Sequence, residues 1–364
     1  MKRLIVCCDG TWQDLYKDYP TNVVKTAQAI SPSGPDGVPQ VVYYDAGLGT
    51  KEIGTKGSFI DRLIRLAGGG IGLGIDQKIE DAYLFLSLNY EPGDDIYLFG
   101  FSRGAYTVRC LAGLIYNSGL PKRKYIRKIP EAYELYRDRG DLSKPSGVDA
   151  TDFRSRYGDR PPIKALCCWD TVESVGLPDL IPGVKLNETF NQRYSFHDNR
   201  INRTIQHAFH AVAIDENRKV FDYTPMESDQ ADQLSQVWFP GGHGCVGGGS
   251  LDERGLSDRP LKWMLENIAP LGLFVDESNV EHGKESGKSI YGIMSDYSAH
   301  FSLARSRFGY VERVIPETSS FSDVDLSTRM RWKDKRCNYR PKNLERRFAK
   351  ELDAWSADFS GISG

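Results

Sequence analysis

The sequence predicts an α/β fold: a mostly parallel sheet with helical insertions and a C-terminal extension. Short apolar runs rich in β-branched and aromatic residues recur along the chain, separated by long helical or irregular stretches, which is typical of parallel strands joined by helices. Each run is almost continuously apolar, as expected for strands that are covered on both faces. The length of 364 residues fits one large domain of this kind with insertions.

Six apolar runs are the expected strands, and several of them end in a polar or glycine-containing cluster. The runs are residues 3–8, 40–44, 95–99, 163–169, 208–214 and 237–239. The clusters are Asp9-Gly10-Thr11, Gly100-Phe101-Ser102, Asp170-Thr171, Asp215-Glu216 and Gly241-Gly242-His243. Ligands and catalytic groups collect beyond the carboxyl ends of strands in open α/β sheets, so these clusters predict an active site at that edge.

Helices are expected between the strands. Residues 75–88 place apolar side chains at helical spacing, and residues 105–115 predict a second helix. A charged, tyrosine-rich stretch predicts a helical insertion at about 121–160. These elements give a core over residues 1–276 and leave residues 277–364 as an extension or cap packed on it.

Composition and charge exclude several classes of protein. The sequence is 40% hydrophobic and 26% charged, which describes an ordinary soluble globular chain, and a net charge of −2 gives no reason to expect nucleic acid as a partner. The first apolar run ends at Asp9 and is too short for a signal peptide, and no segment reaches the length of a membrane span. The chain is therefore expected to be cytoplasmic as synthesised.

The seven cysteines are expected to be buried, reduced thiols. Their number is odd, and Cys7-Cys8 and Cys167-Cys168 are adjacent pairs, a poor geometry for local disulfides and unlike the usual zinc spacings. Neither a metal nor a cofactor is expected.

Gly100-Phe101-Ser102-Arg103-Gly104 matches G-x-S-x-G, the pattern of a nucleophile elbow. The pattern is common by chance, but here a strand-like run precedes it and a helix-like run follows it. Glycines are needed because the tight turn brings helix and strand close together. The turn also presents the serine at a helix N-terminus, where the dipole favours developing negative charge. The sequence therefore predicts an α/β-hydrolase-like fold with Ser102 as the nucleophile.

The chain resembles the DUF2235 family, a hydrolase-domain family that includes type VI secretion phospholipase effectors. The motifs that carry the resemblance fall in the family's order and span nearly the whole chain: Cys8-Asp9-Gly10-Thr11-Trp12, residues 69–76, Gly100-Phe101-Ser102-Arg103-Gly104-Ala105, Trp169-Asp170-Thr171-Val172, His210-Ala211-Val212-Ala213-Ile214-Asp215-Glu216, Phe239-Pro240-Gly241-Gly242-His243 and Tyr339-Arg340-Pro341-Lys342-Asn343-Leu344. One position departs from the family, which usually carries Asp where this sequence has Cys245.

A serine hydroxyl needs a neighbouring base, usually a histidine oriented by a carboxylate. His243 lies in a glycine-rich turn after the last strand-like run, and the chain order of nucleophile, acid and histidine is that of this fold. The family resemblance points to the same residue. His210 lies inside an apolar run and is expected to be a core or supporting residue. The other histidines are His207, just before that run, and His197, His282 and His300, expected at the surface.

Two aspartates compete for the role of the acid. Asp170 and Asp215 both end strand-like runs after Ser102, and topology does not separate them. The resemblance of Trp169-Asp170-Thr171-Val172 to the family's acid motif favours Asp170, with Asp215 as the alternative. Asp258 is a distant third and is more typical of a helix cap.

The oxyanion hole is expected to use the backbone N–H of Arg103 together with one from another strand-end loop. Gly10 and Thr11 are the candidates for that loop, although Asp9 fits a structural turn equally well. The glycine-rich residues 68–74 lack a preceding strand and a P-loop lysine, so a loop near the site mouth, followed by a helix, is expected there and not a nucleotide site. Arg103 and Arg109 are candidates for contacting a phosphate group or for structural ion pairs.

These residues predict a serine esterase or lipase that forms an acyl-enzyme. The resemblance implies a lipid or phospholipid substrate and contact with a membrane surface. The alternatives are a short-chain or polymer carboxylesterase and a non-catalytic, hydrolase-like binding scaffold. For an effector, the expected partners include an immunity or secretion protein, and export would follow a route independent of a signal peptide.

Overall fold

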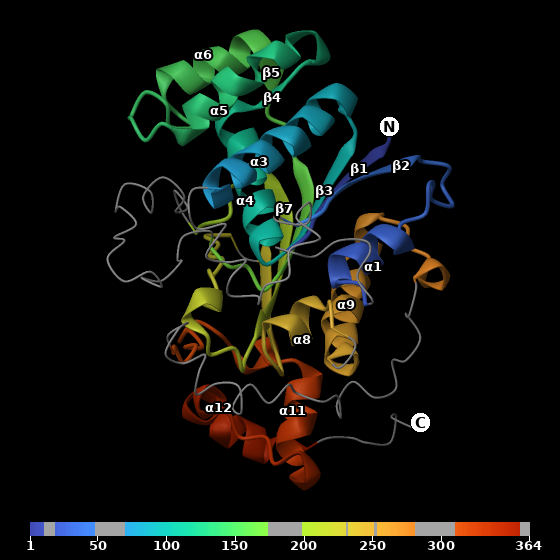
Figure 1. The fold of residues 1–364 in the computed structure, drawn as a ribbon, viewed down its shortest axis with the longest axis vertical. Helices are drawn as coiled ribbons and strands as arrows, with labels where there is room; N and C mark the ends of the chain where they lie inside the picture. The colour runs from blue at the N-terminus through green and yellow to red at the C-terminus, as the bar shows by residue number, and fades with distance from the viewer. Residues whose placement is uncertain are drawn as a thin grey trace.

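A six-stranded parallel sheet forms the centre of the molecule (Figure 1). The computed structural model describes residues 1–10, 19–47, 70–173, 199–230, 232–250, 253–280 and 310–356. Within these ranges the strand order is β2-β1-β3-β6-β7-β8, and every neighbouring pair is parallel. The strands are β1 (Arg3–Cys8), β2 (Gln40–Asp45), β3 (Asp95–Phe101), β6 (Ile163–Trp169), β7 (Ile205–Ala213) and β8 (Leu234–Phe239). The predicted α/β fold and its mostly parallel sheet are confirmed.

Helices cover both faces of this sheet, which explains why its strands are apolar throughout. Along β1, Leu4 and Val6 pack into one buried cluster, whereas Ile5 and Cys7 pack into another on the opposite face. The first cluster is completed by α3 (Gly70–Asn89) and α4 (Arg103–Ser118), and the second by α1 (Asn22–Ala29) and α9 (Arg254–Ile268). Figure 1 shows these two pairs of helices on either side of the strands.

The stretch between α4 and β6 forms the predicted helical insertion. It contains η2 (Arg123–Lys128), α5 (Ile129–Arg137) and α6 (Val148–Tyr157). A small antiparallel sheet of β4 (Leu120–Pro121) and β5 (Gly158–Asp159) closes it. The sequence did not predict these strands, because two residues each are too few for a periodic signal. The insertion lies at the end of the molecule opposite α11 and α12 (Figure 1).

The C-terminal segment packs against the β8 edge of the sheet. It contains η7 (Phe321–Asp323), α11 (Leu326–Lys333), η8 (Lys335–Cys337) and α12 (Lys342–Ala354). Leu344, Phe348 and Leu352 recur every fourth residue along α12 and are buried with Trp238 of β8 and Val212 of β7. The residues from 310 to 356, called the C-terminal extension below, therefore share a buried core with the central sheet.

The remaining short elements lie between β7 and β8, between β8 and α9, and after α9. They are η3 (Lys219–Phe221), α8 (His243–Gly247), η4 (Ala269–Leu271) and η5 (Glu277–Asn279). Among the described helices, none is long and apolar enough to cross a membrane. All seven cysteines lie in described segments; none forms a disulfide, and all are buried except the partly exposed Cys337.

Two local predictions are wrong. Gly70 to Gly74 lie in the first turns of α3 and not in a loop, while residues 68 and 69 fall outside the described ranges. Asp258 lies inside α9, which begins at Arg254, and its carboxylate accepts from Lys25 Nζ at 2.8 Å. It therefore forms an ion pair between helices and does not cap one. His197, His282 and His300 lie outside the described residues.

Candidate active site

The G-x-S-x-G motif forms a sharp turn between β3 and α4. Ser102 follows the last residue of β3 and precedes the first residue of α4, with φ of 57° and ψ of −122°. A non-glycine residue rarely adopts this conformation, and strain of this kind clusters at functional sites. The backbone N–H of Ser102 donates to the Trp169 carbonyl oxygen at 3.0 Å, which ties the turn to the end of β6.

The two glycines of the motif are required by close packing. A Cβ atom on Gly100 would lie 2.5 Å from the Gly104 carbonyl oxygen, and one on Gly104 would lie 2.1 Å from the Cys8 carbonyl oxygen. Any larger residue at these two positions would separate α4 from β3 or β1. The close approach of helix and strand that the sequence predicts is therefore the reason for both glycines.

His243 is the first residue of α8 and is buried, with 7% of its surface exposed. The sequence suggested a flexible turn here, whereas the backbone enters a short helix whose first amide donates to Glu216 Oε2 at 3.1 Å. The imidazole lies between two aromatic rings, with centroid distances of 4.6 Å to Phe101 and 4.9 Å to Phe221. These contacts fix the plane of the His243 ring next to Phe101, the residue that precedes Ser102.

Asp170 follows β6 and is completely buried. Its Oδ2 accepts from His243 Nδ1 at 2.6 Å, and its Oδ1 accepts from the Ala213 backbone N–H at 2.9 Å. Like Ser102, Asp170 has a positive φ, here 42°. Because Nδ1 faces a carboxylate, it carries the proton, and Nε2 is left as the basic nitrogen of the ring.

A buried arginine from the C-terminal extension completes the surroundings of Asp170. Arg313 Nη1 donates to Asp170 Oδ1 at 2.6 Å, and Nη2 donates to Oδ2 at 2.9 Å. Burial alone would raise the pKa of Asp170, but the Arg313 guanidinium and the hydrogen bond from His243 outweigh it and hold that pKa well below its usual range. Sequence reasoning missed Arg313, since nothing in its local pattern distinguishes it from other cationic residues.

Asp215, the alternative acid, does not contact His243 in any recorded hydrogen bond. Its Oδ2 accepts from the Gly241 N–H at 2.6 Å and from the Tyr339 hydroxyl at 2.7 Å. Burial raises the pKa of Asp215 to about 6, against the lowering effect of these two donors. Asp215 thus holds the loop that leads into α8, while Asp170 reaches the imidazole.

His210 and Arg109 have structural partners. His210 Nε2 accepts from the Thr171 N–H at 3.2 Å, and its Nδ1 bonds to Gln236 Oε1 at 2.8 Å. Burial, with help from Arg109, lowers the pKa of His210 to about 3, so its ring is neutral. Arg109 donates to the carbonyl oxygens of Thr224 and Pro225, both at 2.8 Å. His210 is therefore a supporting residue that fixes the backbone next to Asp170.

Gly10, predicted from the sequence as an oxyanion-hole residue, lies against the turn at Ser102. A Cβ atom on Gly10 would lie 3.2 Å from both the Ser102 Cβ and the Phe101 ring. In this structure, however, the Gly10 N–H donates to Asp9 Oδ1 at 2.7 Å, and Asp9 Oδ2 also accepts from Thr21 and Tyr44. The Gly10 amide would have to leave or share this bond to hold an oxyanion. Thr11 lies outside the described residues, and Arg103 begins α4 directly after Ser102.

Cys245 lies in α8 and is fully buried. It packs against Gly241, where an added Cβ atom would lie 2.4 Å from the Cys245 Cβ. Burial, followed by the negative charge of Glu253, raises the pKa of its thiol, which therefore stays neutral. A small neutral side chain suits this position beside the loop that Asp215 holds.

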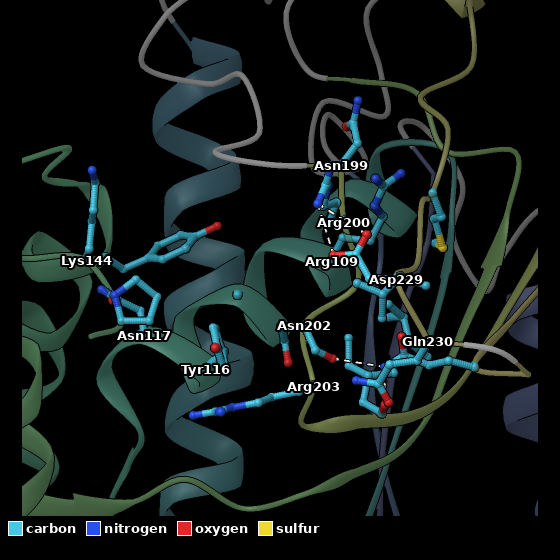
Figure 2. A pocket seen from close by; sticks show the side chains of 18 of the residues that line it. Arg109, Tyr116, Asn117, Lys144, Asn199, Arg200, Asn202, Arg203, Asp229 and Gln230 are labelled. Atoms are coloured by element: carbon cyan, nitrogen blue, oxygen red, sulfur yellow. Dashed lines mark hydrogen bonds and ion pairs between the residues drawn. The ribbon is translucent and has the colours of Figure 1, made fainter. Parts of the chain in front are cut away.

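A cavity of about 610 Å³ lies apart from these groups (Figure 2). It is lined on the α4 side by Arg109, Tyr116 and Asn117 and on the β7 side by residues that include Arg200 and Arg203. Ser102, Asp170 and His243 are not among its lining residues. Within the described segments, no group of three or more His, Cys, Asp or Glu side chains is placed to hold a metal ion.

Comparisons with known proteins place the chain in one family. The sequence profile described as "T6SS, Phospholipase effector Tle1-like, catalytic domain" matches residues 2–267. An uncharacterized protein of Saccharomyces cerevisiae, YEL023C, is 29% identical over 240 residues, which are 62% of this chain and 33% of that protein. The chain therefore spans about a third of the length of this curated relative.

Two solved structures match the chain at low sequence identity. One is a Tle1 effector bound to the VgrG spike of the type VI secretion system, with 17% identity and a TM-score of 0.38 over 68% of this chain and 51% of that chain. The other is an uncharacterized protein from Pseudomonas aeruginosa, with 18% identity and a TM-score of 0.42 over 84% of this chain and 50% of that one.

Proposed function

Because the chain belongs to the family of Tle1-like phospholipase effector catalytic domains, we propose that it hydrolyses acyl esters of lipids through an acyl-enzyme on Ser102. Membership of this family implies lipid hydrolysis. The observation that supports the serine mechanism best is the buried pair of His243 and Asp170 beside the strained turn at Ser102. Three groups needed for nucleophilic catalysis thus come from the ends of different strands.

In the proposed reaction, the Ser102 hydroxyl oxygen attacks the carbonyl carbon of the ester while His243 Nε2 takes the hydroxyl proton. The tetrahedral intermediate collapses, the C–O bond to the alcohol breaks, and the imidazole returns the proton to the leaving oxygen. Water then attacks the acyl-serine by the same route and releases the carboxylic acid. Asp170 keeps the proton on Nδ1 throughout and stabilises the imidazolium that forms at each step.

The oxyanion is proposed to bind at the start of α4. The amide of Arg103 follows the nucleophile directly, and the helix N-terminus favours the negative charge that develops there. Gly10, with Thr11 beside it, is the proposed second donor, provided that substrate binding draws the Gly10 amide away from Asp9.

A second enzyme class, a short-chain or polymer carboxylesterase, would use the same groups. A non-catalytic scaffold is disfavoured because Ser102 and Asp170 both carry a positive φ, a conformation that is unfavourable for non-glycine residues and that binding alone does not require. A membrane surface, a secretion component and an immunity protein are proposed partners for an effector of this kind.

The nucleophile is tested by labelling the purified protein with a fluorophosphonate probe, which forms a covalent bond with activated serines. We expect the wild type and Ser155→Ala, which changes an exposed serine of α6, to be labelled, and Ser102→Ala to be unlabelled. His243→Ala should slow labelling by more than about 100-fold, since general-base catalysis contributes that much. Labelling of Ser102→Ala at the wild-type rate would exclude the proposed nucleophile.

The substrate class is tested by rates on p-nitrophenyl esters of increasing acyl length and on phospholipid vesicles. A lipid-hydrolysing enzyme should favour long acyl chains and release fatty acid from vesicles. A preference for short chains with no release from vesicles would select the carboxylesterase.

A further inference from the structure

Arg313 makes a two-point contact with the carboxylate that faces His243. Its two terminal nitrogens donate to the two oxygens of Asp170, at 2.6 and 2.9 Å. Both side chains are buried, with 2% of Arg313 and 0% of Asp170 exposed. Planar pairing of this kind fixes orientation as well as charge, which a single ammonium group does not do.

The guanidinium is itself held in place by other parts of the fold. Nη1 also donates to the Ala213 carbonyl oxygen at 2.8 Å, and Nη2 donates to that of Phe221. The Tyr223 ring lies 5.4 Å from the guanidinium carbon. Arg313 is therefore bound to the end of β7 and to η3, and these contacts fix the position of the guanidinium that binds Asp170.

Within the described part of the chain, each oxygen of Asp170 has one further donor besides Arg313. Oδ1 accepts from the Ala213 amide and Oδ2 from His243 Nδ1. Arg313 thus sets the rotation of the carboxylate that directs Oδ2 at the imidazole. Removing it would leave a buried carboxylate without its cation and free to turn away from His243.

We infer that Arg313 is a positioning residue of the proposed triad, acting through Asp170, and that the C-terminal extension is an integral part of the active site. This inference rests on the proposed function. The residues that match the family profile end at 267, so the arginine that holds the acid lies outside the matched catalytic domain.

The extension makes further contacts with the strand ends that carry the site. The Tyr339 hydroxyl donates to Asp215, and Asn343 Nδ2 donates to the Ile214 carbonyl oxygen at 2.9 Å. Asp215 in turn accepts from Gly241, two residues before His243. The C-terminal extension therefore stabilises both Asp170 and the loop that leads to His243.

Other charged groups surround the pair and have partners of their own. Glu216, which accepts from the His243 backbone amide, forms an ion pair with Arg218 at 2.6 Å. Burial raises the pKa of Asp222, and the nearby Asp170 adds to this effect, whereas Arg313 opposes it. His210, from β7, is neutral. Among the described residues, Arg313 is thus the cation that directly balances Asp170.

The test compares the full-length variants Arg313→Met and Arg313→Lys with the wild type. Arg329→Met is the matched control, because Arg329 lies in the same extension and, among the described residues, donates to backbone carbonyl oxygens and not to Asp170. We expect Arg313→Met to lower kcat by more than about tenfold with little change in KM, since the ester does not touch this residue. The acid limb of its pH–rate profile should move upward, because loss of the neighbouring cation favours the protonated forms of the hydrogen-bonded pair of Asp170 and His243.

Arg313→Lys keeps the charge but not the two-point contact. It should retain the wild-type acid limb and still lose part of kcat. A wild-type kcat and pH profile in Arg313→Met, or a wild-type kcat in Arg313→Lys, would overturn the inference. If Arg313→Met does not fold, as judged by the loss of a cooperative melting transition, Arg313→Lys decides the question.

A readout independent of turnover separates this inference from the proposed function. The proton on His243 Nδ1, hydrogen-bonded to Asp170, should give a downfield NMR resonance in the wild type that disappears in His243→Gln. We expect Arg313→Met to lose or shift this resonance, and Arg329→Met to keep it. A wild-type resonance in Arg313→Met contradicts the inference even if the protein hydrolyses esters, whereas absence of probe labelling and of ester hydrolysis contradicts the proposed function alone.

Discussion

The ends of β6 and β7 lie side by side and carry two aspartates that look equivalent in sequence but differ in their neighbours. Asp170, after β6, faces an imidazole and a guanidinium, and its pKa is held well below its usual range. Asp215, after β7, faces a backbone amide and a phenol, and burial raises its pKa to about 6. The same residue type and topology thus give one carboxylate that stays ionised and one that is protonated in mild acid.

The difference shows that the cationic partner, and not the position in the sheet, separates the two candidate acids. Arg313 lies 143 residues after Asp170 in the chain. Among the described residues, the donors to the Asp215 carboxylate are the Gly241 amide and the Tyr339 hydroxyl, and both are neutral. A carboxylate that must stabilise an imidazolium has to remain charged, and Asp170 meets that requirement.

Asp170→Asn is the change expected to have the largest effect on this contrast. An amide cannot fix the same imidazole tautomer, so for the proposed mechanism kcat should fall by about 10⁴-fold, as it does for the acid of known serine triads. Arg313 would also lose its counter-charge while buried, which should destabilise the fold by about 3–5 kcal/mol. Ester turnover and urea denaturation measure the two effects. A fall in kcat of less than tenfold, in protein that denaturation shows to be folded, would remove Asp170 from the proposed triad.

Sequence reasoning predicted the sheet well because the signal for it is local. The predicted runs at 3–8 and 163–169 match β1 and β6 residue for residue, and β7 and β8 each begin three residues earlier than predicted. Continuous apolar character identifies a strand covered on both faces, and its ends are marked by polar clusters. Short helices such as α8 carry too few residues for a periodic signal.

The site was predictable where the chain itself brings groups together, and not where the tertiary fold does. The turn at Ser102 depends on its two flanking glycines, which are visible in the sequence. Arg313 is one of 47 Lys and Arg residues, and only the packing of the extension brings it to Asp170. Leu344, Phe348 and Leu352 recur every fourth residue, a helical spacing that identifies α12 from the sequence alone.

Asp215→Asn is expected to have a medium effect. It should stabilise the fold, whereas Asp170→Asn should destabilise it. A carboxyl group whose folded pKa is raised stabilises the fold fully below its unfolded pKa, and that contribution is lost as the pH rises through about 6. Asn can still accept from Gly241 and does not ionise. The unfolding free energy of the variant relative to wild type should therefore rise by about 1–2 kcal/mol between pH 4 and 7. This value is smaller than the full pKa shift implies, because Asp215 is partly exposed and solvent screens its charge.

Activity gives the second arm of that comparison. Since Asp215 holds only the loop before His243, kcat of Asp215→Asn should fall by less than about tenfold, against about 10⁴-fold for Asp170→Asn. Equal losses in the two variants would mean that Asp215 contributes to catalysis as much as Asp170 does. Denaturation at a series of pH values and ester turnover are the two measurements.

Tyr339→Phe should give the smallest effect and the finest test of the environment of Asp215. The change removes one donor to Oδ2, and because the Tyr339 hydroxyl lowers the pKa of Asp215, its loss raises that pKa further above 6. The pH range over which the fold loses stability should move upward. The unfolding free energy should fall by about 1 kcal/mol, and kcat should change by less than about threefold. In an Asp215→Asn background the pH-dependent part of this effect should vanish, because the group that titrates is absent. If the upward move persisted in that background, another carboxyl group would be responsible, and the contrast between the ends of β6 and β7 would not rest on Asp215.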